Sequence, residues 1–256
     1  MNKANHILSA ARLSLVLSLS FCTTESAELP PPPSSDSHGG FSSSSDAVVS
    51  SSSEPPRSRS VTVTSCPASI PADSFCDTRD YKVYKQVKIG EYQTWMAENL
   101  NYNARYSVCY SNNASNCDTY GRLYNWATAM NGAASSSAAP SGVQGVCPTG
   151  WHLPSDAEWD ALNIAVGGTS TAGRKLKATS GWSSGGTDEF GFSALPGGYG
   201  RSDGNFINVG RRGFWWSATE KRASRAWGRY MDYYSEGVNR YNYAKGFLFS
   251  VRCVQD

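Results

Sequence analysis

One stretch restricts the local fold more than any other part of the chain: Gly150-Trp151-His152-Leu153-Pro154-Ser155-Asp156-Ala157-Glu158-Trp159. Ser155 and Glu158 have the spacing of a capping box, in which the serine hydroxyl accepts from the glutamate amide and the glutamate side chain reaches back to the serine amide. A helix is therefore predicted from Asp156 to Gly167-Gly168. The capping box accounts for Glu158, and Asp156 in the first turn complements the helix dipole, so we assign neither carboxylate to catalysis.

Short elements and turns are expected on both sides of this helix. Residues 81–89 alternate in polarity and, with residues 92–96, predict a hairpin. Gly121 is expected to open a helix that Asn131-Gly132 ends, and a shorter helix is expected at 171–178. After residue 182 the pattern indicates turns, including Gly197-Gly198-Tyr199-Gly200, and short strands at 190–195, 214–218 and 247–254.

These elements predict an α+β domain with two or three short helices, short antiparallel strands and long irregular loops. The domain is expected at residues 66–256. It is preceded by a tether at 28–65 that is rich in proline and serine and therefore expected to be disordered. Residues 1–27 have the charge and the short apolar stretch of a signal peptide. Cys22 directly after the apolar stretch resembles the acylated cysteine of bacterial lipoproteins, although Phe21 before it departs from that pattern. An ordinary signal peptide with an incidental cysteine is the alternative.

The six cysteines after residue 65 are an even set behind an export signal, which favours disulfides. A zinc site is the alternative, but the paired short spacings of tetrahedral zinc sites are not present among them. Many connectivities are open to six cysteines. We predict pairing in sequential order, with the bonds Cys66–Cys76, Cys109–Cys117 and Cys147–Cys253.

The net charge of the chain, +2, is too small to indicate a nucleic-acid binder. The region 211–245 nevertheless holds eight basic residues against three acidic ones. Tyr, Ser, Gly, Asn and Arg dominate this region, and such residues are typical of binding loops because tyrosine offers a large contact with few rotatable bonds. The candidate ligand-binding residues are Arg225, Trp227, Arg229, Tyr230, Tyr233, Tyr234, Asn239, Arg240, Tyr241 and Tyr243. A hairpin whose tyrosines alternate on a half-exposed sheet is the alternative.

Seven blocks in order resemble the Fibrobacter succinogenes major paralogous domain family over residues 77–256. They are Val87-Lys88-Ile89-Gly90, Gln93 to Tyr102, Tyr120 to Trp126, Gly150 to Trp159, Gly191 to Gly198, Phe214 to Glu220 and Phe249 to Cys253. The resemblance implies a C-type-lectin-like fold, related to formylglycine-generating-enzyme-like domains and to the variable proteins of diversity-generating retroelements. In those variable proteins the ligand-binding residues fall in a stretch comparable to 223–245.

Two departures limit what the resemblance implies. The Glu-Pro-Asn or Gln-Pro-Asp motif of sugar-binding, calcium-dependent lectins is absent, and no cysteine pair matches the catalytic pair of formylglycine-generating enzymes. His152, the one histidine after residue 65, has no evident nucleophile beside it in the sequence, so we interpret it as structural. We assign no catalytic residue.

The chain is thus expected to be a non-enzymatic binding or adhesion module, secreted or tethered to the outer bacterial surface. A polysaccharide or a surface protein is the expected partner, and the basic residues indicate acidic groups such as uronates. We expect no cofactor, no metal, no nucleic acid, and membrane attachment only through a lipid anchor at Cys22. A structural component of a surface layer or matrix, which would self-associate, is the alternative. An enzyme of the formylglycine-generating-like fold comes third.

Overall fold

The computed structural model describes residues 64–256. The predicted signal peptide at 1–27, the predicted acylation of Cys22 and all but the last residues of the predicted tether at 28–65 lie outside the described residues.

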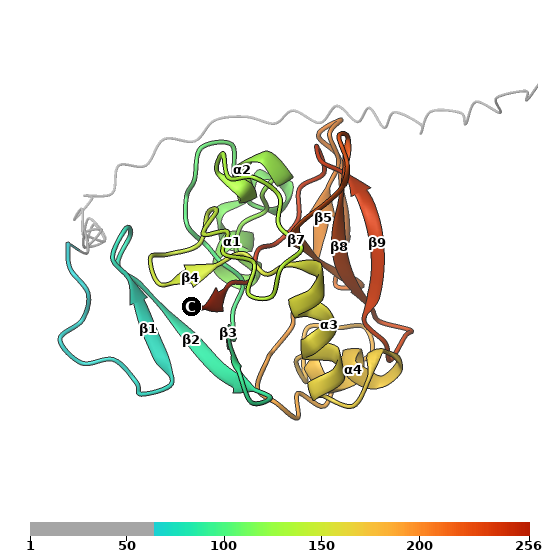
Figure 1. Cartoon of the computed structure of the whole chain (residues 1–256), viewed down its shortest axis with the longest axis horizontal. Helices are drawn as coiled ribbons and strands as arrows, with labels where there is room; N and C mark the ends of the chain where they lie inside the picture. The colour runs from blue at the N-terminus through green and yellow to red at the C-terminus, as the bar shows by residue number, and fades with distance from the viewer. Residues whose placement is uncertain (1–63) are drawn as a thin grey trace, which may run out of the picture. The chain divides into compact units, whose positions relative to one another are not determined.

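Two five-stranded sheets form the framework of the described chain (Figure 1). The first sheet has the order β1-β2-β3-β10-β4 and is antiparallel, and the second has the order β6-β5-β7-β8-β9 with one parallel pair, β5 and β7. The strands are β1 (Ser74–Asp77), β2 (Lys82–Ile89), β3 (Gln93–Met96), β4 (Trp151–His152), β5 (Gly197–Gly200), β6 (Phe206–Val209), β7 (Arg212–Arg222), β8 (Arg225–Asp232), β9 (Asn239–Ala244) and β10 (Val254–Gln255). The helices are η1 (Tyr110–Asn112), α1 (Ala114–Tyr120), α2 (Trp126–Met130), α3 (Asp156–Ala165) and α4 (Thr169–Leu176).

The predicted α+β class is wrong, and with it the C-type-lectin-like architecture that the resemblance implied. The described chain is mostly β, with a helical content of only 17%. The longest helix, α3, has ten residues. The helix expected from Gly121 begins only at Trp126, because Gly121 has a φ of +74° and Leu123 pairs with Val108 in extended backbone.

Several predicted elements differ from the structure in the second half of the chain. Residues 190–195 contain an isolated bridge at Ala194 and no strand, whereas the glycine-rich segment expected to be a turn is strand β5. The closing strand expected at 247–254 is reduced to β10 at its end. In contrast, the predicted hairpin is formed by β2 and β3.

The capping box at the start of α3 is confirmed. The Ser155 hydroxyl accepts from the Glu158 amide at 3.1 Å, and Glu158 Oε2 accepts from the Ser155 amide at 2.8 Å. This helix packs against β7 and β8, and Figure 1 shows α3 and α4 beside the second sheet. The predicted helix start thus also positions the acidic residues of its first turns against that sheet.

Strand β7 contributes to two hydrophobic clusters, because its side chains point alternately to opposite faces. Phe214 and Trp216 pack in one cluster, where the Trp216 ring lies 4.3 Å from that of Phe249. Trp215 packs in the other cluster, beside Trp159 of α3. The second sheet therefore has one face toward α3 and another toward the segment that includes Phe249.

Three disulfides staple the described chain: Cys66–Cys76, Cys109–Cys117 and Cys147–Cys253, the pairs expected from their order. Disulfides of this kind persist in oxidising surroundings, so they indicate an extracellular rather than a cytoplasmic protein. Among the helices of residues 64–256, none has the length and apolarity needed to cross a membrane.

Asn99 ties together four distant parts of the chain. Its side-chain oxygen accepts from Trp215 Nε1 at 2.8 Å and from Arg252 Nη2 at 3.1 Å, and its amide nitrogen donates to the Tyr120 carbonyl at 2.8 Å and to Ser250 Oγ at 3.3 Å. Asn99 and Arg252 are both buried, so each of these bonds satisfies a group that would otherwise be costly to desolvate. Four of the seven blocks that carry the family resemblance therefore meet around Asn99.

Candidate functional site

The β8–β9 hairpin divides the predicted ligand-binding residues between two faces. Arg229 lies opposite Arg240, and Tyr230 lies opposite Asn239. Because successive side chains of a strand point to opposite sides, the register places two sets back to back. We call one set the charged face, consisting of Arg225, Trp227, Arg229 and Arg240. The other set is part of what we call the tyrosine face: Tyr230, Asn239, Tyr241 and Tyr243.

The charged face is paired within the molecule. Arg229 is 1% exposed and contacts Asp156 at 2.6 Å and Asp160 at 2.9 Å, both on α3. Arg240 bonds the other oxygen of Asp156 at 2.6 Å and lies 3.4 Å above the Trp227 ring. These arginines hold α3 against the sheet, so their charges are already compensated.

The tyrosine face is a continuous chain of aromatic rings centred on Tyr243. Its ring centroid lies 5.2 Å from that of Tyr241, 6.5 Å from Tyr230 and 6.4 Å from Phe247, and Phe247 lies 5.7 Å from Tyr199 of β5. Tyr241 is 53% exposed and the other four rings are partly exposed. We define the tyrosine face by these five rings together with Asn239.

Buried phenylalanines support this face from below. The Tyr243 ring meets that of Phe249 at 4.8 Å and that of Phe214 at 5.9 Å, and Phe214 also contacts Tyr199 at 4.7 Å. Gly228 lies in β8 opposite Tyr241, where an added Cβ would come within 3.3 Å of Tyr243. The rings are therefore held in place by packing before any ligand arrives.

The polar atoms of the tyrosine face are not used within the fold. In residues 64–256, no hydrogen bond joins the hydroxyls of Tyr199, Tyr230, Tyr241 or Tyr243 to another residue. Burial raises the pKa of Tyr243, and neighbouring Tyr230 and Tyr199 raise it further. The Tyr243 phenol consequently stays protonated, and a protonated phenol can both donate and accept hydrogen bonds.

Tyr233 and Tyr234 lie beyond the end of β8 rather than on the hairpin. Their rings meet edge to face at 5.1 Å, and the Tyr234 hydroxyl accepts from Arg212 Nη2 at 3.0 Å. Arg212 also forms an ion pair with buried Asp232. The two tyrosines line a separate hollow, together with Arg174 and Lys177 at the end of α4.

Two members of the tyrosine face, Tyr199 and Phe247, were not among the predicted residues. Tyr199 is the single bulky residue of a glycine run, and this was a weak indication that its side chain has a role. Phe247 precedes the last family block and has no comparable signal. Only the pairing of β5 with β7, and the bridge between Gly200 and Leu248, bring both beside the hairpin.

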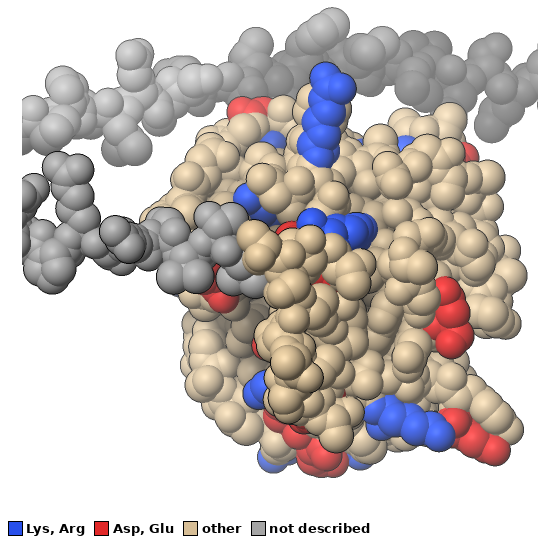
Figure 2. All heavy atoms as spheres, turned by 90° about the vertical axis from the view of Figure 1, so that its left-hand side faces the viewer, with Lys and Arg blue, Asp and Glu red and all other residues tan. Residues whose placement is uncertain are grey.

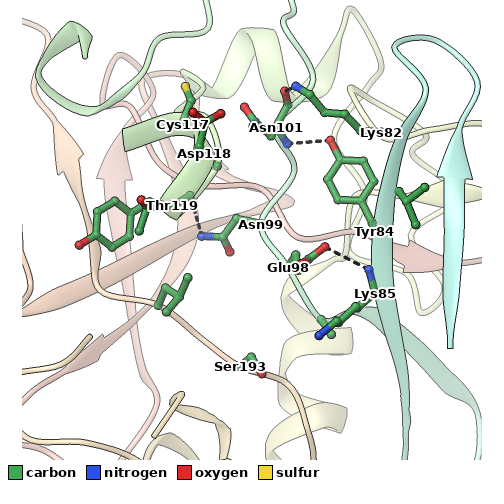
Figure 3. Close-up of a pocket in the computed structure, with 15 residues that line it drawn as sticks. Lys82, Tyr84, Lys85, Glu98, Asn99, Asn101, Cys117, Asp118, Thr119 and Ser193 are labelled. Carbon is green, nitrogen blue, oxygen red and sulfur yellow. Dashed lines mark hydrogen bonds between the residues drawn. The ribbon is translucent and has the colours of Figure 1, made fainter. Parts of the chain in front are cut away.

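A polar cavity of about 390 Å³ lies between β2, the segment after β3 and α1 (Figure 3). Glu98 accepts from the Lys85 amide at 3.1 Å, and the Tyr84 hydroxyl accepts from the Asn101 amide at 3.0 Å. Lys82 Nζ donates to the Asn101 carbonyl at 2.6 Å. These bonds brace the cavity wall. Acidic and basic side chains are interspersed on the face of the molecule toward β1 and β2 (Figure 2).

His152 lies between two carboxylates. Its Nε2 is 2.7 Å from Glu158 Oε1, and its Nδ1 is 2.7 Å from Asp256 Oδ1. Burial alone would lower the pKa of His152, but the bonds and charges of Glu158 and Asp256 outweigh burial and raise it. The second oxygen of Glu158 accepts from the amides of Ser155 and Ser141. Both groups are thus committed to holding the start of α3.

These observations define a disulfide-stapled, mostly β domain that presents a supported aromatic surface. Residues 87–255 match the profile of the Fibrobacter succinogenes major domain, and the chain belongs to that family. The predicted family is therefore confirmed, while the family description names no activity or ligand. Comparisons with curated proteins and with solved structures give no match.

Proposed function

We propose that this protein is a non-enzymatic binding module that holds a polysaccharide on its tyrosine face. The observation that carries the proposal is the continuous chain of partly exposed rings whose hydroxyls bond to no other described residue. Aromatic rings of this kind are amphipathic, because the faces suit apolar contacts and the phenol suits hydrogen bonds.

A sugar ring matches such a surface in two respects. Its C–H groups form an apolar face that stacks on an aromatic ring, and its hydroxyls are donors and acceptors at the ring edge. Asn239 and the phenols of Tyr241 and Tyr243 offer partners for those hydroxyls. Support by Phe214 and Phe249 favours binding further, since side chains already ordered lose less entropy when a ligand docks.

The bonds of the acid–base groups around the start of α3 support a role without catalysis. His152 and Glu158 bond to each other and to the cap of α3, and Asp156 bonds to Arg229 and Arg240. A general base must be free to reach a substrate proton. Attachment to the outer surface through Cys22 belongs to the same proposal, because a tethered binding module would bring the cell to its polymer.

Retention of the oxidised full chain on insoluble glucan, mannan and chitin tests the proposal. Tyr241→Ala is expected to lower retention about tenfold, the loss of about 1.4 kcal/mol that one stacked ring provides. Tyr241→Phe keeps the ring and should retain most binding. Tyr92→Ala is the matched control, because Tyr92 is 84% exposed but lies in the turn between β2 and β3.

Equal retention of Tyr241→Ala and the unaltered chain would remove the tyrosine face from consideration. Sedimentation of the same samples separates the structural alternative: concentration-dependent self-association without polymer retention would favour a surface-layer component. Circular dichroism and oxidised-thiol counts confirm that each variant is folded.

A further inference from the structure

We infer that the ligand of the tyrosine face is an uncharged glycan and not a polyuronate. This inference rests on the proposed function and adds the chemical class of the ligand. The basic residues of 211–245 indicated acidic groups in the sequence, but the structure places most of these charges on the other side of the hairpin or in ion pairs within the fold.

Half of these eight cations lie on the side of the hairpin opposite the tyrosine face. Arg225, Arg229 and Arg240 point to the charged face, on the other side of the β8–β9 hairpin. Lys221 also lies on that side, 5.1 Å from the Trp227 ring. A ligand stacked on Tyr241 and Tyr243 would therefore have the sheet between itself and these charges.

Carboxylates within the fold neutralise three of the cations. Arg229 and Arg240 bond to Asp156, and Lys245 bonds to Glu220. Arg225 donates to the Asn242 carbonyl at 2.9 Å. The basic excess that the sequence suggests is thus not available to a ligand on the opposite side.

Arg212 is the basic side chain that shares the tyrosine face within β5, β8, β9 and the first half of β7. Its register partner is Asp232, which is buried and forms an ion pair with it. The Tyr234 hydroxyl takes up another of its donors. Arg212 and Asp232 together add no net charge to the surface.

The cost of desolvation then favours an uncharged ligand. A uronate carboxylate pressed onto the rings would lose water without gaining an unpaired cation, and removing a charge from water is costly unless it is paired. A neutral sugar loses only the hydration of its hydroxyls, and the phenols of Tyr230, Tyr241 and Tyr243 replace those hydrogen bonds.

The test measures retention of the oxidised full chain on insoluble glucan, mannan and chitin and on cross-linked polygalacturonate. Each polymer is tested at low salt and at about 1 M NaCl, where charge interactions are screened within about 3 Å. We expect retention on at least one uncharged polymer, changed less than about twofold by salt and lowered about tenfold by Tyr241→Ala. The double variant Lys221→Gln/Arg222→Gln, which removes exposed charges away from the rings, should leave it unchanged.

Other outcomes overturn the inference in distinguishable ways. Retention on polygalacturonate that depends on Tyr241 and falls with salt would leave the proposed function standing and make the ligand acidic. Retention on no polymer, or retention that Tyr241→Ala does not change, would overturn the proposed function and the inference with it.

Discussion

The two faces of the β8–β9 hairpin carry alternating residues of one short segment, yet they differ in nearly every physical respect. On the charged face, Arg229 is almost fully buried and paired with α3. On the tyrosine face, Tyr241 is half exposed and its hydroxyl has no partner among the described residues. Residues adjacent in sequence thus serve stability on one side and form the proposed binding surface on the other.

The largest effect on the free energy of unfolding is expected when a buried arginine of the charged face is replaced. Arg229→Ala should lower the free energy of unfolding by about 3 kcal/mol, because it removes the buried guanidinium that bonds to Asp156 and Asp160 and leaves Asp156 to Arg240 alone. Urea unfolding followed by tryptophan fluorescence measures the loss. Arg222→Ala, an exposed position on the neighbouring strand, should change it by no more than about 0.5 kcal/mol. Equal stability of the two variants would mean that the buried pair contributes nothing net.

A smaller effect is expected from pH, acting on the helix that the charged face holds. The raised pKa of His152 means that its contribution is complete below the ordinary value of about 6.5 and is lost as pH rises through the folded pKa. Stability should fall across that window by about 1.4 kcal/mol for each unit of elevation. The His152→Gln variant should lack this step in urea unfolding between pH 6 and 9. A histidine NMR titration with a pKa below 6.5 would contradict the prediction.

The smallest effect is expected on the tyrosine face itself. Tyr243→Phe should change the free energy of unfolding by less than about 0.5 kcal/mol, since the lost hydroxyl has no partner in the described chain. Tyr124→Phe provides the contrast, because the buried Tyr124 hydroxyl donates to the Tyr102 carbonyl at 2.7 Å and its loss should cost about 1 kcal/mol. If Tyr243→Phe is the more damaging of the two, the tyrosine face is part of the fold and not a free surface.

Features set by neighbouring residues were predictable. The capping box needs only Ser155 and Glu158, and the β2–β3 hairpin needs only its alternation and the turn at Gly90. The family blocks likewise identified the family. Each of these depends on contacts within a few residues, or on a pattern that survives without knowing the partners.

The helix expected from Gly121 shows why other predictions failed. Leu123 and Trp126 have helical spacing, but Leu123 pairs with Val108 and Tyr124 pairs with Phe249, and these isolated bridges hold the backbone extended until Trp126. Tertiary pairing outweighed a weak local preference, and repeated over the chain this changed the class from α+β to mostly β.

The amino-acid sequence alone determined the family, the start of α3 and the composition of the 225–243 segment, because these are local or compositional properties. Only the tertiary structure decided that Arg229 and Arg240 pair with α3, while Tyr230, Tyr241 and Tyr243 share a surface with Tyr199 and Phe247. The reason is that side chains alternate with a period of two, so the strand register decides which residues share a surface. Composition gives the numbers of charged and aromatic residues in the segment, whereas the strand register decides which of them lie on each face.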